Sequence, residues 1–206
     1  MAYDLTPHLD PARTAVLVFE CQEGVIGAGS MLAGLAEAVK QGGTGDAIAA
    51  LIDAARAAGS RIFYCNAAKR PDGIGNPFNT PLEARLREKS GGAKPMDAGD
   101  VVAALAPRDG DVVVNREHGM TGFYESGLDA FLRNTGVETV VITGVSVNVG
   151  VLGTAIEAVN RGYTVIVPTD CVAGDPPEYA EQALRYSIRN VAFLTTRDEI
   201  EQVWKV

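Results

Sequence analysis

A single carboxylate, Glu20, stands directly after the five apolar residues 15–19. An apolar run directly before a carboxylate indicates that its side chain is partly buried, because a solvated carboxylate rarely follows such a run. Burial raises the pKa of a carboxyl group and suits it to general acid or base catalysis. The alternative is a strand-end charge that is simply hydrated or bonded to neighbouring backbone.

Two basic side chains in the stretch NREHGM (residues 115–120) could serve such a carboxylate. Arg116 would hold Glu20 ionised and orient it, although a purely structural ion pair is an equally good interpretation. His118 can titrate near neutral pH and is a candidate auxiliary group, against the commoner case of an incidental loop histidine.

The stretch VSVNVG (residues 145–150) is typical of a turn between a strand and a helix. Backbone N–H groups at a helix start can bind an oxyanion or a carboxylate, which makes Asn148, Val149 and Gly150 candidate substrate-binding residues. Gly150 would permit close approach of a ligand, or would only ease packing.

The remaining candidates for substrate binding lie elsewhere in the chain. Lys69 and Arg70 could clamp an anionic substrate, or could be solvated loop charges, and the aromatic Phe123 completes the expected set. Cys21 and Cys171 have no convincing base partner, so each is interpreted as a small buried apolar residue.

Strands and helices must alternate to position these residues. Apolar β-branched runs predict six strands, at residues 14–20, 61–66, 111–115, 139–144, 163–168 and 192–196. Helical spacing predicts helices at residues 46–59, 126–136, 151–162, 176–191 and 198–204. We therefore expect a three-layer α/β/α sandwich with a six-stranded, mostly parallel, Rossmann-like sheet. Ligands of such folds bind beyond the carboxyl ends of the strands, where long insertions at residues 21–44 and 67–98 would shape a pocket.

Composition narrows the class of protein. The 206 residues suit one domain spanning 1–206, and the net charge of −8 argues against nucleic acid or anionic membrane as the main partner. No apolar run reaches the roughly 20 residues that cross a bilayer, and the N-terminus lacks a signal-peptide pattern, so a cytoplasmic location is expected. Three scattered cysteines and two histidines predict neither a disulfide framework nor a metal site. No glycine fingerprint predicts a cofactor, so a small-molecule substrate is the expected partner.

Two stretches carry a resemblance to a known family. TAVLVFECQEGVIG (residues 14–27) and the long run from NREHGM to CVAG (residues 115–174) resemble the isochorismatase-like hydrolase family. The resemblance covers nearly the whole chain from Thr14 onward and implies the isochorismatase-type fold and a homo-oligomer. The family's usual catalytic set is an Asp ending the first strand, a Lys after the third, and a Cys at the helix start after the fourth.

All three family positions differ in this chain. Glu20 stands for the Asp and Gly150 for the Cys, while Arg116 stands for the Lys when one counts from Asp111. Counting back from Phe123 puts Glu117 at that position instead, so the assignment stays open. The family's mechanism of thiolate attack is therefore not expected here.

The resemblance leaves two functions open. The isochorismatases that name the family also carry Gly at the turn, and cleave a vinyl ether by protonating its enol carbon. The first expectation is a cysteine-independent hydrolase of a small polar or carboxylated metabolite, cleaving a vinyl ether or a C–N bond with Glu20 as acid or base. Arg116 opposes proton donation unless burial of Glu20 outweighs it. The second expectation is an inactive family member that binds a small molecule or serves as a scaffold.

Overall fold

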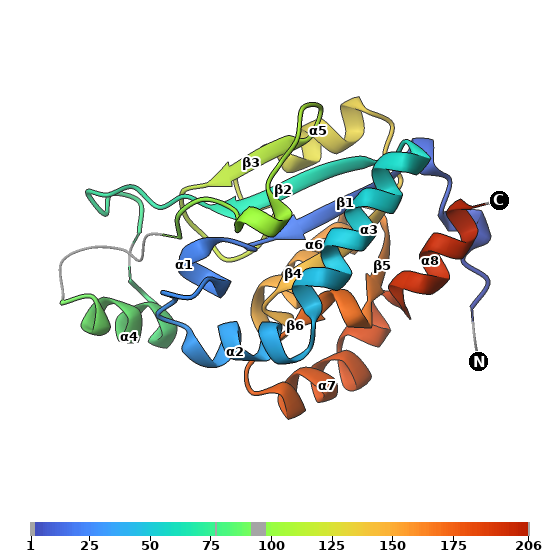
Figure 1. Ribbon diagram of the computed structural model, residues 1–206. Helices are drawn as coiled ribbons and strands as arrows, with labels where there is room; N and C mark the ends of the chain where they lie inside the picture. Colours follow the sequence, from blue (N-terminus) through green and yellow to red (C-terminus); the bar gives the residue numbers. More distant parts are fainter. Residues whose placement is uncertain (1–2, 77, 92–97, 206) are drawn as a thin grey trace.

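A computed structural model describes residues 3–76, 78–91 and 98–205. In this part of the chain seven strands form one sheet in which every strand pairing is parallel (Figure 1). The strand order is β3-β2-β1-β4-β5-β7, and β6 pairs with the end of β4. The strands are β1 Thr14–Phe19, β2 Arg61–Ala67, β3 Val112–Arg116, β4 Thr139–Val145, β5 Thr164–Pro168, β6 Val172–Ala173 and β7 Phe193–Thr195.

The predicted α/β fold with a parallel sheet is confirmed, and all six expected strands are present. The expected strand number was wrong by one, because β6 is a further strand that pairs Val172 with Gly144 and Ala173 with Val145. A two-residue strand is too short to show the hydrophobic periodicity on which strand prediction rests.

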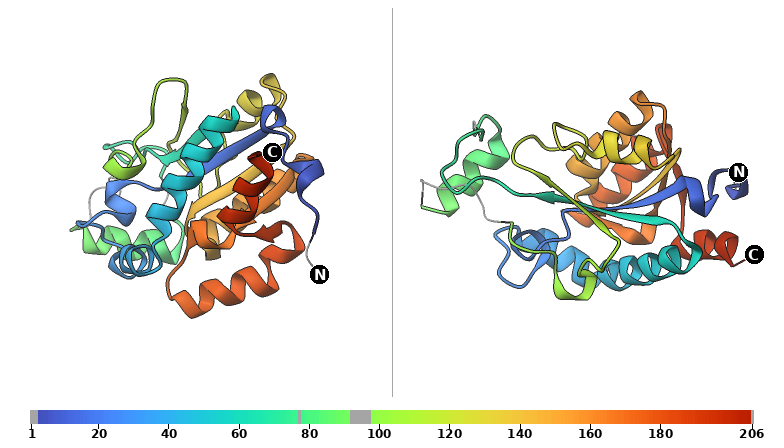
Figure 2. Two further views of the ribbon diagram at one scale, coloured as in Figure 1. Left: turned by 45° about the vertical axis from the view of Figure 1, so that its right-hand side comes forward. Right: turned by 90° about the horizontal axis from the view of Figure 1, so that it is seen from above.

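Helices cover both faces of the sheet, as the view from above shows (Figure 2, right). The described α-helices are α1 Glu23–Ile26, α2 Ala33–Gln41, α3 Thr44–Ala58, α4 Pro81–Lys89, α5 Leu128–Asn134, α6 Leu152–Asn160, α7 Pro177–Tyr186 and α8 Arg197–Trp204. The helix expected over residues 176–191 is shorter, because a separate 3-10 turn follows at Ile188–Asn190.

The central strand β1 explains the continuous apolar run at residues 14–19, since all six of its residues are buried. Leu17 and Phe19 pack with buried residues of α5, α6 and α7 on one face. Val16 and Val18 pack with buried residues of α3 and α8 on the other. Strands of parallel sheets are usually buried on both faces. Their sequences are therefore continuously apolar and do not alternate between polar and apolar residues.

The described parts of the two insertions lie beyond the carboxyl ends of the strands, where α1, α2 and α4 gather at the arrowhead side of the sheet (Figure 1), while residues 77 and 92–97 lie outside the described residues. At this edge β1 and β4 approach so closely that Gly144, with a φ of +100°, has no room for a side chain beside the backbone of Phe19. None of the described helices is long and apolar enough to cross a membrane.

Candidate active site

Glu20 and Arg116 form a buried ion pair at the carboxyl edge of the sheet. Glu20 follows β1 and Arg116 ends β3, and the pairing of both strands with β2 brings them together. Nη2 of Arg116 donates to Oε1 of Glu20, and its Nε donates to the carbonyl of Gly119 at 3.2 Å. The Arg116 side chain is 5% exposed and that of Glu20 is 21% exposed. The pair predicted between these residues is therefore present as a contact.

The backbone of Glu20 is unusual for a residue with a side chain. Its φ of +50° lies in the left-handed region, and its N–H donates to the carbonyl of Cys65 at 3.0 Å. Left-handed conformations destabilise a non-glycine residue by about 1–2 kcal/mol and cluster at functional sites, where surrounding structure holds them in place.

Burial decides the protonation behaviour of Glu20. Loss of hydration raises the pKa of this carboxyl above its ordinary value of 4.5, and this effect outweighs the opposing charges of Arg116 and Lys69. Loss of hydration therefore opposes the tendency of Arg116 to keep Glu20 ionised. A carboxyl group with a raised pKa is suited to donate a proton.

Arg116 also has a spare donor. Its Nη1 is buried and has no hydrogen-bond partner among the described residues, and Arg116 lines a cavity together with Glu20. Buried polar atoms are nearly always hydrogen-bonded, so an unpartnered guanidinium nitrogen beside a cavity is suited to bind an oxygen of a ligand.

Glu20 and Arg116 lie in an inner cavity of about 100 Å³. An outer cavity of about 510 Å³ adjoins it, because six residues line both of them. The shared residues are Leu32, Leu35, Leu82, Leu86, Ser146 and Val149. Besides these, the inner cavity is lined by Glu20, Val25, Ala67, Lys69, Glu83, Arg116, Gly119, Met120 and Gly150.

Gly150 lines the inner cavity but leaves no space for a side chain. A Cβ atom at this position would overlap Cε1 of Phe19 and lie 3.1 Å from its Cδ1 and Cζ atoms. The Phe19 ring, which is fully buried, therefore fills the volume in which a side chain at residue 150 would begin.

The turn Val147–Val151, a π-helical turn that continues into α6, differs in detail from the expected anion pocket. The N–H of Val149 donates to the carbonyl of Ser146 at 3.2 Å, so this donor is already used within the turn. Asn148 lines the outer cavity, and its Oδ1 is buried without a hydrogen-bond partner among the described residues. Val149 lines both cavities with its side chain 38% exposed overall.

No cysteine lines either cavity. Cys21, Cys65 and Cys171 are all buried, and Sγ of Cys21 donates to the carbonyl of Phe19 at 3.6 Å. Burial raises the pKa of the Cys21 and Cys65 thiols to about 12. A thiol with so high a pKa is protonated at neutral pH and is a poor nucleophile.

Two candidates that follow Arg116 in sequence lie away from the cavities. Nε2 of His118 lies 2.7 Å from Oε2 of Glu125, and its ring packs edge-on against Tyr124. Glu117 is exposed and does not line the site. Of the two residues that the sequence left open, Arg116 is therefore the one beside Glu20.

Of the other expected substrate-binding residues, Lys69 lines a cavity, whereas Arg70 and Phe123 do not. Lys69 lines the inner cavity and its Nζ lies 2.5 Å from Oε1 of Glu83 on α4, so this ion pair joins the end of β2 to that helix. Arg70 instead pairs with Asp72 at the surface. Phe123 is buried in the core and its ring stacks on that of Tyr163, because its side chain belongs to the packing of α5 and α6 against the sheet.

Sequence reasoning assigned no chemical role to Gln22, which braces the site. Its Nε2 donates to the carbonyls of Ala67 and Gly99 at 2.9 and 2.6 Å, and its Oε1 accepts from the Ala67 N–H at 2.8 Å. Gln22 stood beside Glu20 in the stretch that carries the family resemblance, but its partners lie 45 and 77 residues away. Such partners cannot be found without the tertiary structure.

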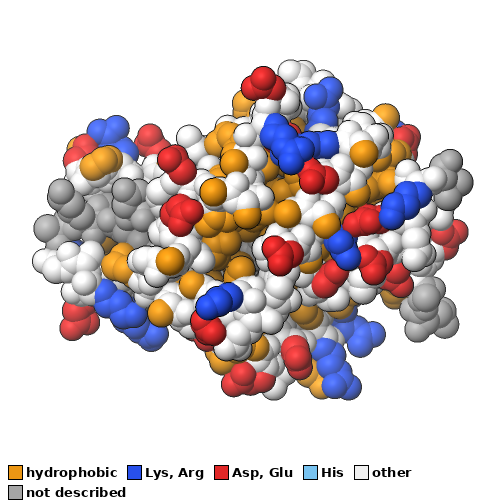
Figure 3. Space-filling model, viewed as in Figure 1, with side chains coloured by type: hydrophobic (Ala, Val, Ile, Leu, Met, Phe, Trp, Pro, Cys, Tyr) orange, Lys and Arg blue, Asp and Glu red, His pale blue; other side chains and the backbone are white. Residues whose placement is uncertain are grey.

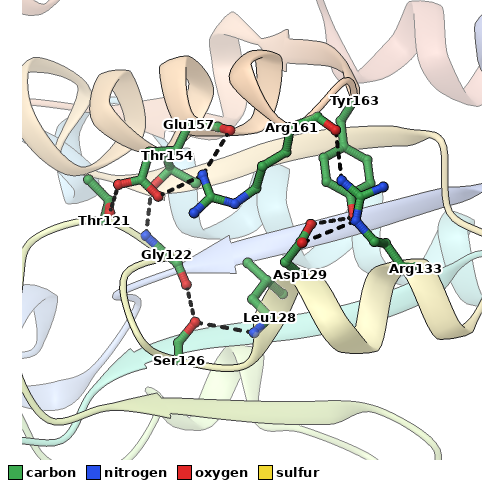
Figure 4. A network of polar contacts seen from close by, with 10 residues as sticks. All are labelled: Thr121, Gly122, Ser126, Leu128, Asp129, Arg133, Thr154, Glu157, Arg161 and Tyr163. Atoms are coloured by element: carbon green, nitrogen blue, oxygen red, sulfur yellow. Dashed lines mark hydrogen bonds and ion pairs between the residues drawn. The ribbon is translucent and has the colours of Figure 1, made fainter.

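A polar network holds the loop after Arg116 against α6 (Figure 4). The N–H of Gly122 donates to Oγ1 of Thr154 at 2.9 Å, and Oγ1 of Thr121 donates to Oε1 of Glu157 at 2.7 Å. Because the same loop carries the Gly119 carbonyl that binds Arg116, the network positions the guanidinium from a helix that begins beside Gly150.

Within the described part of the chain, no group of three or more His, Cys, Asp and Glu side chains could hold a metal ion.

Comparison with known proteins identifies the family. An isochorismatase domain matches residues 14–199, from the start of β1 into α8. The chain belongs to the isochorismatase family. This membership makes it an isochorismatase-family hydrolase by descent and confirms the resemblance found in the sequence.

Relatives of this isochorismatase-family chain match most of its length. The isochorismatase family protein YwoC of Bacillus subtilis is 28% identical over 199 residues, covering 96% of this chain and 98% of YwoC. The ureidoacrylate amidohydrolase RutB of Methylobacterium radiotolerans is 32% identical over 190 residues, covering 85% of this chain and 72% of RutB. The crystal structure of a cysteine hydrolase from Pseudomonas syringae pv. phaseolicola matches with a TM-score of 0.73 at 26% identity, covering 95% and 93% of the two chains.

Proposed function

We propose that this isochorismatase-family chain is a hydrolase that acts on a small carboxylated metabolite without a cysteine nucleophile, with Glu20 as its general acid. The observation that carries the proposal is the buried Glu20–Arg116 pair in a cavity that no thiol lines. Cleavage of a vinyl ether is the reaction that fits this arrangement best, because it needs a proton and a water molecule but no protein nucleophile.

The reaction proceeds in balanced steps. The protonated Glu20 carboxyl transfers its proton to the terminal enol carbon, which leaves a cation stabilised by the ether oxygen. Water adds to the cationic carbon and returns a proton to the Glu20 carboxylate. The resulting hemiketal breaks its C–O bond and yields an alcohol and a keto acid. Substrate and one water thus give two products, and Glu20 ends as it began.

Arg116 supports this role in two ways. Its Nη2 pairs with Glu20 when the carboxyl is ionised, and so stabilises the enzyme after proton transfer. Its unpartnered Nη1 is suited to bind the carboxylate of the substrate. Burial raises the pKa of Glu20 and so favours the protonated carboxyl with which the first step begins.

Hydrolysis of a C–N bond is the second reaction class, favoured by the name of one relative. RutB of Methylobacterium radiotolerans is a ureidoacrylate amidohydrolase. In this chain the same cleavage would require an ionised Glu20 to remove a proton from the attacking water, since Gly150 supplies no nucleophile. The raised pKa of Glu20 favours the acid role over this base role.

The deciding experiment measures pyruvate release from isochorismate by the purified protein. Wild-type protein should release pyruvate and Glu20→Gln should not, because the amide cannot donate a proton of comparable acidity. Glu23→Gln is the matched control, since Glu23 is an exposed carboxylate three residues further on that lines neither cavity. Ammonia release from ureidoacrylate, tested on the same proteins, reports the C–N alternative.

A binding protein without turnover is the non-enzymatic alternative, and the same compounds separate it from an enzyme. A ligand that raises the melting temperature without being consumed indicates binding alone. In that case Glu20→Gln should keep the stabilisation, whereas an enzyme should keep binding but lose product formation.

A further inference from the structure

The inner and outer cavities differ in how their charges are partnered. In the inner cavity each cation already faces a carboxylate, since Arg116 pairs with Glu20 and Lys69 pairs with Glu83. A ligand group that enters the inner cavity therefore meets charges that compensate each other. An anionic group there can still accept from the unpartnered Nη1 of Arg116, but it gains less than beside an unpaired cation, because Glu20 already compensates the charge of that guanidinium.

The outer cavity carries two cations without a carboxylate partner. Arg85 and Lys89 of α4 both line it, and neither forms an ion pair with any described residue. Nζ of Lys89 donates only to the carbonyl of Met31, at 3.3 Å. Basic side chains, with an acidic one beside them, lie near the place of α4 in the space-filling view (Figure 3).

The opposite wall of the outer cavity offers one acidic group. Asp175 lines it beside Gly34, at whose position a Cβ atom would meet the Asp175 carboxylate. The lining therefore has two cations and one anion, which leaves an excess positive charge on the α4 side. Four leucines line both cavities and make part of their walls apolar, namely Leu32, Leu35, Leu82 and Leu86.

We infer that the two cavities together bind an amphiphilic anion, whose apolar body lies along the four leucines and whose anionic end group binds Arg85 and Lys89. The reacting group would occupy the inner cavity, and this last step alone rests on the proposed function. The volume of the outer cavity, about 510 Å³, falls within the range of about 300–1,000 Å³ that small-molecule sites have. Arg85 and Lys89 are then residues that determine specificity for a carboxylate remote from the scissile bond.

Octanoate and 1-octanol are probes that share an apolar chain and differ in the charge at one end. Isothermal titration of the wild-type protein should show tighter binding of octanoate. The double variant Arg85→Met, Lys89→Met should bind octanoate at least fivefold more weakly and 1-octanol with unchanged affinity. Raising the salt concentration should weaken octanoate binding to the wild type, because the end group lies near the solvent.

Lys40→Met is the control, since Lys40 is an exposed cation on α2 that lines neither cavity. An equal loss in this control, or no loss in the double variant, would overturn the inference. Loss of octanoate binding on Arg116→Met but not in the double variant would place the anion in the inner cavity and also reject it. No binding of either probe by wild-type protein would do the same. Because these titrations measure binding alone, they stand whether or not isochorismate is hydrolysed.

Discussion

The buried ring of Phe19 occupies the space that a side chain on Gly150 would need. Phe19 precedes the proposed acid on β1, and Gly150 lies in the turn after β4. A side chain at residue 150 would therefore require the Phe19 ring to move. Glycine at 150 is a packing requirement of this chain.

Gly150→Cys should destabilise the protein by about 1–3 kcal/mol or more, because overpacking forces Phe19 to move. Urea unfolding measures the change. Phe19→Val, combined with Gly150→Cys, should cost less than the sum of the two single changes, because the smaller side chain makes room for the thiol. Gly29→Cys is the control, since nothing lies within 4 Å of a Cβ atom at that position. Strict additivity of the two changes would contradict the proposed overlap.

The stability of the fold should depend on pH through Glu20. Its pKa is raised by burial above 4.5 in the folded protein, so the folded state holds this proton more tightly than the unfolded chain does. The contribution to stability is complete below about pH 4.5 and is lost as pH rises through the folded pKa. The free energy of unfolding of wild type relative to Glu20→Gln should therefore fall between acidic and neutral pH. A difference that grows over this range would show that Arg116, not burial, dominates.

Arg116→Met should raise the pKa of Glu20 further, because the guanidinium is the main influence that lowers it. A ¹³C NMR titration of the glutamate carboxyl groups, assigned with Glu20→Gln, measures the change. Arg116→Lys keeps the positive charge and should shift the pKa less. An unchanged titration in Arg116→Met would mean that the two groups do not interact.

Gln22→Leu should reduce the free energy of unfolding by about 2–4 kcal/mol, because it removes three hydrogen bonds of a buried side chain, two of them to backbone groups of Ala67. Urea unfolding followed by circular dichroism gives the value. Gln41→Leu removes an exposed bond to Glu37 and should change stability by less than about 0.5 kcal/mol. Equal effects of the two changes would argue against a bracing role.

Thr154→Val should destabilise the protein by about 1–3 kcal/mol, because the buried N–H of Gly122 loses its acceptor without a loss of volume. Thr154→Ser keeps the hydroxyl and should retain most of that bond. Hydrogen exchange at the Gly122 amide offers a local readout, with faster exchange expected in the valine variant than in the serine variant. Equally slow exchange in both would remove Thr154 from the network.

The sequence predicted the sheet well because each long strand carries its own signal. The runs at residues 14–19, 61–67 and 139–145 are rich in apolar and β-branched side chains, a signal that needs no tertiary information. The sequence did not predict β6, because its two residues form a strand only through their pairing with β4.

The contact between Glu20 and Arg116 could be predicted from the sequence because both residues end strands, whereas the position of His118 depends on the path of a loop. Glu20 follows β1 and Arg116 ends β3, and these strands flank β2 in one parallel sheet. The contact between the two side chains therefore follows from the strand order. His118 follows Arg116 by only two residues, yet the loop carries it to Glu125. The cations of α4 were overlooked because an amphipathic charged helix looks the same in sequence whether or not it walls a cavity.

The Lys69–Glu83 pair and the Lys89–Met31 bond join α4 to the rest of the site, while Glu20 is held by the sheet. The helix that carries Arg85 and Lys89 is thus a different element from the strands that position Glu20 and Arg116, although α4 also lines the inner cavity. A graft that replaces α4 with the matching segment of a relative would test whether this helix selects the ligand, with the proposed acid and its guanidinium left in place. Under the proposal, relatives that share this fold could differ in substrate through substitutions in α4 alone, while the sequence of the sheet stays the same.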